Sequence, residues 1–190
     1  RSRVTFTDAE VVFVGYGIQA PEYGWDDFKG VDVAGKVLLM LNDDPDWDPE
    51  LFAGERRLQY GRWSYKYESA ARQGAAAALV VHTTESAGYP WRVVRTSNSG
   101  EQFELPAGDE PRTLVNGFLS EEASRRLAAA AGHNLDELVR AARSRDFRPV
   151  PLALTTGLDL AVDVRSSATA NVAGILRGSD PELAREAVVL

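Results

Sequence analysis

The chain of 190 residues contains no cysteine and only two histidines, His82 and His133. The lack of cysteine excludes disulfide bonds and thiolate catalysis. A catalytic zinc site normally takes three protein ligands from His, Cys, Asp and Glu, and neither histidine has another at ligand spacing. A nucleophilic serine needs a base and an orienting group, but Ser97 and Ser99 lie in no G-x-S-x-G motif. We therefore expect these residues to hold no catalytic group, no metal and no cofactor.

Long apolar runs and an excess of positive charge are also absent. No uninterrupted apolar run approaches the roughly 20 residues that a membrane-spanning helix needs, and the first residues do not form a signal peptide. The chain has 21 Lys and Arg against 28 Asp and Glu, a net charge of −7, with the basic residues scattered. Nucleic acid is therefore a poor partner. The lack of an initiator Met indicates a fragment of a larger protein, and 44% hydrophobic residues predict a globule with a real core.

Short apolar runs bounded by turn residues predict buried strands. The run at residues 9–18 closes on Gly15 and Gly17, which predicts a strand that enters a turn. Alternation of apolar and polar residues predicts a long strand after the prolines of the C-terminal third. Besides the first run, the predicted strands are residues 36–41, 77–82, 152–165, 170–176 and, at the end, 187–190.

Three segments have helical signals. Residues 65–76 show apolar side chains at helical spacing, with Gly74 expected where the helix packs closely on the sheet. Ser120 is a predicted N-cap, followed by two glutamates, for a helix that stops at Gly132. Asn134 is the predicted N-cap of another helix, over residues 135–145.

The loops offer two acidic patterns. Residues 42–49 (NDDPDWDP) carry four aspartates and two prolines, which predicts an exposed loop. Asp44, Asp46 and Asp48 resemble the opening of a calcium loop, but the glycine and the glutamate that such a loop requires later are missing. A solvated acidic loop is favoured. Likewise Glu22, Asp26 and Asp27 are interpreted as surface and turn residues.

The pattern Gly15-x-Gly17-x-x-Ala20 follows the first predicted strand and has the form of a dinucleotide fingerprint. That fingerprint needs a helix whose N-terminus binds the pyrophosphate. Pro21 and Gly24 break any such helix at once. The pattern is therefore interpreted as a turn.

Several blocks together resemble one family. They are residues 12–18 (VFVGYGI), 23–37 (YGWDDFKGVDVAGKV) and 61–82 (GRWSYKYESAARQGAAAALVVH), with 88–91 (GYPW) and 100–103 (GEQF). They are similar to the protease-associated domain inserted in M28-type zinc aminopeptidases. Residues 169–182 (TANVAGILRGSDPE) resemble the strand and turn with which the peptidase domain of that family resumes.

The resemblance implies an α+β, mostly β fold, with a β-sandwich or barrel-like sheet flanked by helices. It divides the chain into an N-terminal edge segment (residues 1–8), a protease-associated domain (9–150) and the first strands of an α/β peptidase domain (151–190). The parent would be a zinc exopeptidase that cleaves peptide bonds at a free N-terminus, and family habit implies export to the periplasm or outside the cell. No metal ligand or catalytic acid of the family has a counterpart in these residues.

The expected role is to cover the metal cleft and shape substrate access, with the chain's own peptidase domain and the peptide substrate as partners. Residues 83–110 form a predicted functional loop with some strand of its own. Within it, Trp91, Arg92 and Arg95 are the candidate substrate-facing residues, because an aromatic and two guanidinium groups suit a peptide's apolar side chain and carboxylates. The alternative is an independent module that binds a protein or peptide at an exposed sheet edge, without service to a peptidase.

Overall fold

The computed structural model describes residues 2–106, 108–177, 179–180, 182–183 and 186. The chain divides into a compact unit, Arg3–Leu160, and a second unit that joins Arg1–Ser2 to Ala161–Leu190. Residues 163–177 of the second unit contain neither helix nor strand. The strand predicted at residues 170–176 is therefore wrong, and the one at 187–190 lies outside the described residues.

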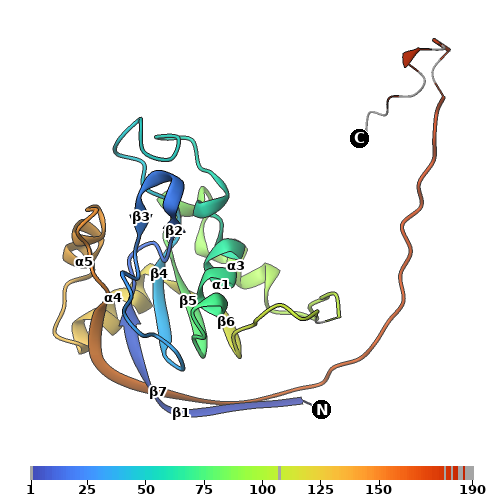
Figure 1. The fold of residues 1–190 in the computed structure, drawn as a ribbon. Helices are drawn as coiled ribbons and strands as arrows, with labels where there is room; N and C mark the ends of the chain where they lie inside the picture. Colours follow the sequence, from blue (N-terminus) through green and yellow to red (C-terminus); the bar gives the residue numbers. More distant parts are fainter. Residues whose placement is uncertain (1, 107, 178, 181, 184–185, 187–190) are drawn as a thin grey trace. The chain divides into compact units, whose positions relative to one another are not determined.

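The compact unit is built on a five-stranded sheet with the order β6-β5-β4-β1-β7 (Figure 1). Four neighbouring strands are parallel: β1 with β4, β4 with β5, and β5 with β6. Their bounds are β1 Ser2–Phe13, β4 Val37–Leu41, β5 Ala77–His82, β6 Val115–Ser120 and β7 Val150–Val162. The strands predicted at residues 36–41, 77–82 and 152–165 are confirmed, whereas the first strand begins earlier than predicted and ends before Gly15.

Both faces of this sheet are buried at β4, which is why that strand is an unbroken apolar run. Successive side chains of a strand point to opposite faces. Phe13 and Leu39 accordingly belong to one buried cluster, while Leu38 and Met40 belong to another. Figure 1 shows helices α4 (Glu121–Ala130) and α5 (Leu135–Ala142) on one side of the sheet and α1 (Trp63–Arg72) on the other. The predicted α+β class, a sheet flanked by helices, is confirmed at this level.

The two predicted N-caps are confirmed. Ser120 Oγ accepts a hydrogen bond from Ala123 N at 3.2 Å and starts α4. Asn134 Oδ1 accepts one from Asp136 N at 2.8 Å and starts α5. Helix α5 ends at Ala142, a few residues earlier than predicted. These caps fix where α4 and α5 begin along the carboxyl edge of the sheet.

Gly74 has a different role from the predicted one. Helix α1 ends at Arg72, and Gly74 follows it with a φ of +70°. Gly74 N donates to Ala71 O at 2.9 Å, and Ala75 N donates to Ala70 O at 3.1 Å. This is the Schellman pattern of a helix C-terminus, which needs a left-handed residue. A Cβ at Gly74 would meet only Ala34 at 3.5 Å, so the glycine is required by backbone conformation and not by close helix–sheet packing.

The loop predicted at residues 83–110 is correct only for its second half: residues 98–106 and 108–110 form neither helix nor strand, whereas the first half carries two short helices. These are α2 (Thr84–Ala87) and α3 (Trp91–Ser97). Thr83 Oγ1 caps α2 by accepting from Ser86 N at 3.0 Å, and Gly88 ends it in the left-handed conformation. In this first half, Gly88 and Pro90 mark helix ends.

The turn after β1 agrees with the rejection of a dinucleotide site. Gly15 and Gly17 both have positive φ, and the chain then forms the short strands β2 (Gln19–Ala20) and β3 (Trp25–Asp26) of a separate two-stranded ribbon. Between them lies only a 3-10 helix, Pro21–Tyr23. A second 3-10 helix, Gln59–Gly61, precedes α1.

The neighbouring strands β1 and β7 are bent by residues with left-handed backbone. Asp8 in β1 has a φ of 53° and Ala153 in β7 a φ of 52°, a conformation that interrupts an extended strand. Beyond these points β1 and β7 stay paired: Arg3 Nε donates to Asp159 Oδ1 at 2.7 Å. A Cβ at Gly157 would lie 3.1 Å from Phe6 O. The order of these contacts is reversed along the two strands, so they run antiparallel.

Among the described residues, no helix has the length and apolar character needed to cross a membrane.

Candidate functional site

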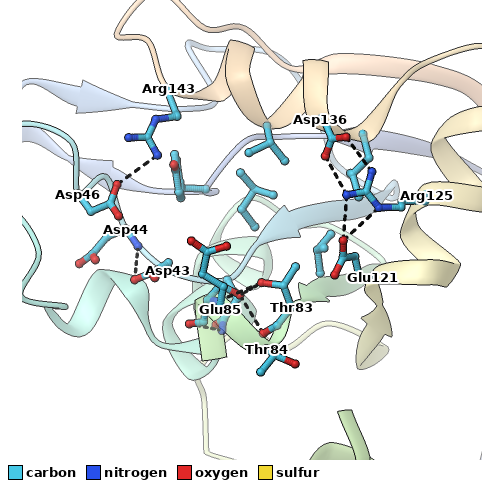
Figure 2. A pocket seen from close by; sticks show the side chains of 17 residues that line it. Asp43, Asp44, Asp46, Thr83, Thr84, Glu85, Glu121, Arg125, Asp136 and Arg143 are labelled. Atoms are coloured by element: carbon cyan, nitrogen blue, oxygen red, sulfur yellow. Dashed lines mark hydrogen bonds and ion pairs between the residues drawn. The ribbon is translucent and has the colours of Figure 1, made fainter. Parts of the chain in front are cut away.

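A cavity of about 570 Å³ lies at the carboxyl edge of the parallel strands. In open parallel sheets this edge is where ligands bind, because the segments that follow the strands meet there. Here the segments after β1, β4 and β5 contribute lining residues together with α4 and α5 (Figure 2). The lining residues are Tyr16, Leu41, Asn42, Asp43, Asp44, Asp46, Val81, Thr83, Thr84, Glu85, Ser86, Glu121, Arg125, Leu135, Asp136, Val139 and Arg143.

Two guanidinium groups of the lining are already paired with carboxylates. Arg125 contacts Glu121 and Asp136, each at 2.9 Å. Arg143 contacts Asp46 at 3.3 Å. Figure 2 shows these two ion-paired groups on opposite sides of the cavity. Neither guanidinium is therefore available as an unengaged anion-binding group.

Two further carboxylates have no guanidinium partner. Asp44 is only 2% exposed, and its Oδ2 accepts a hydrogen bond from Leu58 N at 2.9 Å. Burial raises the pKa of Asp44. Glu85 is exposed and stands between the two ion-paired groups (Figure 2). Within the described part of the chain, no ion pair involves Asp44 or Glu85.

The base of the cavity is aromatic and aliphatic. Tyr16 is 5% exposed, and its ring lies 6.2 Å from the ring of Trp47 and 6.4 Å from that of Trp25. Burial raises the pKa of the Tyr16 hydroxyl, so it stays protonated at neutral pH. Leu41 and Val81 line the cavity from the ends of β4 and β5. The cavity thus joins an apolar base to a rim of carboxylates.

A buried lysine, Lys66, lies against the Tyr16 ring at this base. Lys66 on α1 is 0% exposed, and its Nζ lies 5.8 Å from the centroid of the Tyr16 ring. Burial lowers the pKa of Lys66 to about 7, against the opposing effect of the Asp27, Asp44 and Asp43 carboxylates. Burial also raises the pKa of Asp27, a fully buried residue whose Oδ2 accepts from Ile18 N at 2.9 Å. The prediction that Asp27 is a surface residue is therefore wrong.

Asp43, a lining residue, contacts both Lys66 and Arg57. Its φ of 100° is unusual for a residue other than glycine, and strained residues of this kind gather at functional sites. The backbone carbonyl accepts from Lys66 Nζ, and the carboxylate pairs with Arg57 at 2.9 Å. Arg57 also donates to the carbonyl of Ser86 on α2. These contacts tie the segment after β4 to the segment after β5.

The prediction that residues 42–49 form an exposed loop is wrong in its first half. Asn42 and Asp44 are buried, because Asn42 Nδ2 donates to Ser86 O at 3.2 Å and Leu58 N binds Asp44. Trp47 packs against the aromatic base. The partners of these residues come from distant segments, so local composition gives no sign of them.

The three predicted substrate-facing residues lie away from this cavity. Trp91, Arg92 and Arg95 belong to α3, and none of them lines it. Trp91 is half-buried, with its ring 5.5 Å from that of His82. Arg92 and Arg95 are exposed. Sequence reasoning missed Tyr16 and Glu85 as site residues; the available signal was their position directly after two buried strands.

The two histidines are far from any cluster of metal ligands. His82 is buried, and its Nε2 has no hydrogen-bond partner in the described structure. His133 lies in the turn between α4 and α5. No group of three or more His, Asp or Glu side chains within the described ranges is arranged to hold a metal ion. The zinc implied by the family resemblance therefore has no fitting ligand set in these residues.

Comparison of the chain with family models, with curated protein sequences and with solved structures gives no match.

Proposed function

We propose that the unit Arg3–Leu160 is a non-catalytic protease-associated domain inserted in an M28-type zinc aminopeptidase, where it covers the catalytic cleft and controls substrate access. One observation carries the inserted arrangement: the first and last strands of the unit, β1 and β7, are neighbours in the sheet. Arg3 and Asp159 pair near the two ends. A domain whose ends lie together can be inserted in a host without disturbing it.

The resemblance of the sequence blocks to the protease-associated domain supports an M28-type aminopeptidase as the host. Residues 61–82, which resemble the protease-associated domain, contain α1 and β5. The other two blocks, 12–18 and 23–37, cover the end of β1 with its turn, β3 and the start of β4. A barrel-like sheet of the protease-associated type belongs to this proposal, and the bends of β1 at Asp8 and of β7 at Ala153 support it. Residues 169–182 would then begin the resumed peptidase domain.

In the complete enzyme, zinc would polarise the substrate carbonyl and activate water; its ligands come from the peptidase domain. The contribution of this domain is to bind and orient the peptide. Arg92 and Arg95, one helical turn apart on α3 and both exposed, present two guanidinium groups suited to peptide carboxylates. Trp91 anchors the helix on which they lie.

A second candidate is the independent interaction module. The strand order leaves β6 at the edge of the sheet, and an extended peptide can add to such an edge through main-chain hydrogen bonds. This function needs no peptidase in the same chain.

The coding sequence on both sides of this segment, followed by assay of the full-length product, tests the proposal. We expect flanking peptidase segments and zinc-dependent release of N-terminal residues. Replacement of residues 9–150 by a short linker should leave zinc content and cleavage of a single-residue chromogenic amide intact, but alter kcat/KM for longer peptides. Should the deletion fail to fold, Arg92→Ala with Arg95→Ala serves in its place. Flanking sequence without a peptidase would favour the independent module.

A further inference from the structure

We propose that the cavity at the carboxyl edge of the sheet binds an organic cation, a primary ammonium or guanidinium group on an apolar stem such as the side chain of lysine or arginine. This goes beyond the proposed function, because the site is complete within the unit Arg3–Leu160 and needs no peptidase.

The charge of the lining favours a cation. Six carboxylates and two guanidinium groups face the cavity. Arg125 is shared by two carboxylates, and Arg143 is engaged by one. Arg57, from outside the lining, neutralises Asp43. Asp44 is 2% exposed and interacts with the charge of Lys66, so Glu85 is the exposed lining carboxylate left to attract a ligand. A cavity of this sign raises the local concentration of cations and repels phosphates and carboxylates.

Tyr16 gives an independent indication of a ligand. Its side chain lines the cavity although the residue is 5% exposed. No hydrogen bond joins its hydroxyl to another described residue, and the oxygen is not among the fully buried polar atoms. The hydroxyl therefore opens on the cavity and can accept a hydrogen bond from an N–H donor.

The apolar residues account for the stem. Leu41 and Val81 from the strands and Leu135 and Val139 from α5 line the same cavity. Lysine and arginine bury their methylene stems on apolar surface while the charged end meets polar groups. A volume of about 570 Å³ is in the range of pockets that take small ligands. A bare inorganic cation would make no use of this surface.

Titration calorimetry on the chain tests the proposal with four probes. Nα-acetyl-arginine methylamide is compared with its neutral citrulline analogue, and Nα-acetyl-lysine methylamide with the norleucine analogue. We expect each cationic probe to bind at least about tenfold more tightly than its neutral partner, with affinity falling as salt rises. Spermidine and a pentapeptide with a central arginine distinguish a small amine from a peptide as the source of the cation.

Variants assign the binding to this cavity. Glu85→Gln should lower the affinity for the arginine probe about tenfold, and Tyr16→Phe should lower it about threefold. The melting temperature of Glu85→Gln should equal that of the wild type, because that side chain is exposed. Glu55→Gln is the matched control: it removes the same charge from an exposed residue outside the lining and should change affinity less than twofold. Equal binding of the arginine and citrulline probes would overturn the proposal. So would an unaffected Glu85→Gln, or displacement of the arginine probe by millimolar calcium.

Discussion

Lys66 Nζ donates a hydrogen bond at 2.6 Å to the backbone carbonyl of Asp43, a residue that lines the cavity. The lysine is fully buried, and an ionised ammonium group removed from water is costly unless carboxylates and hydrogen bonds compensate. Here Asp27, Asp44 and Asp43 favour the charged form, while burial opposes it more strongly. The contact ties Lys66 to Asp43, a residue with positive φ, and the burial of the lysine makes stability depend on pH.

The first prediction concerns that pH dependence. The pKa of Lys66 is lowered to about 7 in the folded chain from 10.5. Between these values the unfolded chain binds the additional proton, so the free energy of unfolding should rise with pH, by up to about 1.4 kcal/mol per pH unit. Lys66→Met should abolish this rise. Urea unfolding at pH 7, 8, 9 and 10 measures it.

Lys36→Met is the control for that experiment, because Lys36 pairs with Glu10 at the surface and its removal should leave the pH dependence of the wild type. A rise of the same slope in Lys66→Met would show that another group titrates in this range.

The second prediction concerns the end of α1. Gly74 has a φ of +70°, which costs other residues about 1–2 kcal/mol. Gly74→Ala should lower the free energy of unfolding by about that amount, although there is room for the methyl group. Gly100→Ala is the matched control, because Gly100 has no positive φ and no neighbour within 4 Å of an added Cβ. Equal denaturation midpoints for the two variants would contradict the C-cap role.

The third prediction concerns the start of α4, the helix that carries Glu121 and Arg125 to the cavity. Ser120→Ala removes the acceptor of the Ala123 N–H and should cost about 1 kcal/mol. Ser120→Thr keeps a hydroxyl and should recover most of the loss. Denaturant midpoints measured side by side provide the check; no recovery by threonine would mean that the hydroxyl hydrogen bond contributes little.

The features of the fold and the cavity that could be predicted from the sequence are those set by residues close together in the chain. The strand β5 and the caps Ser120 and Asn134 were predictable because an apolar run and a capping side chain act within a few residues. The burial of Asp44 was not, because its partner Leu58 follows 14 residues later. The cavity was missed for the same reason. Tyr16 and Glu85 line one cavity because the strands β1, β4 and β5 are parallel and adjacent.

Helix α3 illustrates a local failure of the same reasoning. Composition indicated a loop for residues 83–110, yet Pro90 and Gly88 mark the start and end of helices. On this helix Trp91 and the two arginines have different surroundings. The Trp91 ring contacts His82, whereas Arg92 and Arg95 are exposed. In a complete enzyme, replacing Trp91 should therefore affect stability, and replacing the two arginines should affect activity.

The last prediction tests these different roles of Trp91 and the two arginines in the full-length peptidase that we propose as the host. Trp91→Ala should lower the melting temperature, because it removes an aromatic ring from a buried contact with His82. Arg92→Ala combined with Arg95→Ala should leave the melting temperature and zinc content unchanged but lower kcat/KM for peptides about tenfold, equivalent to about 1.4 kcal/mol of transition-state binding. Arg112→Ala is the control, since it removes a charge from a half-exposed side chain outside α3. Unchanged kinetics of the double variant on peptides of several lengths would mean that α3 faces away from the substrate, and the interaction module at the β6 edge would then be the better hypothesis.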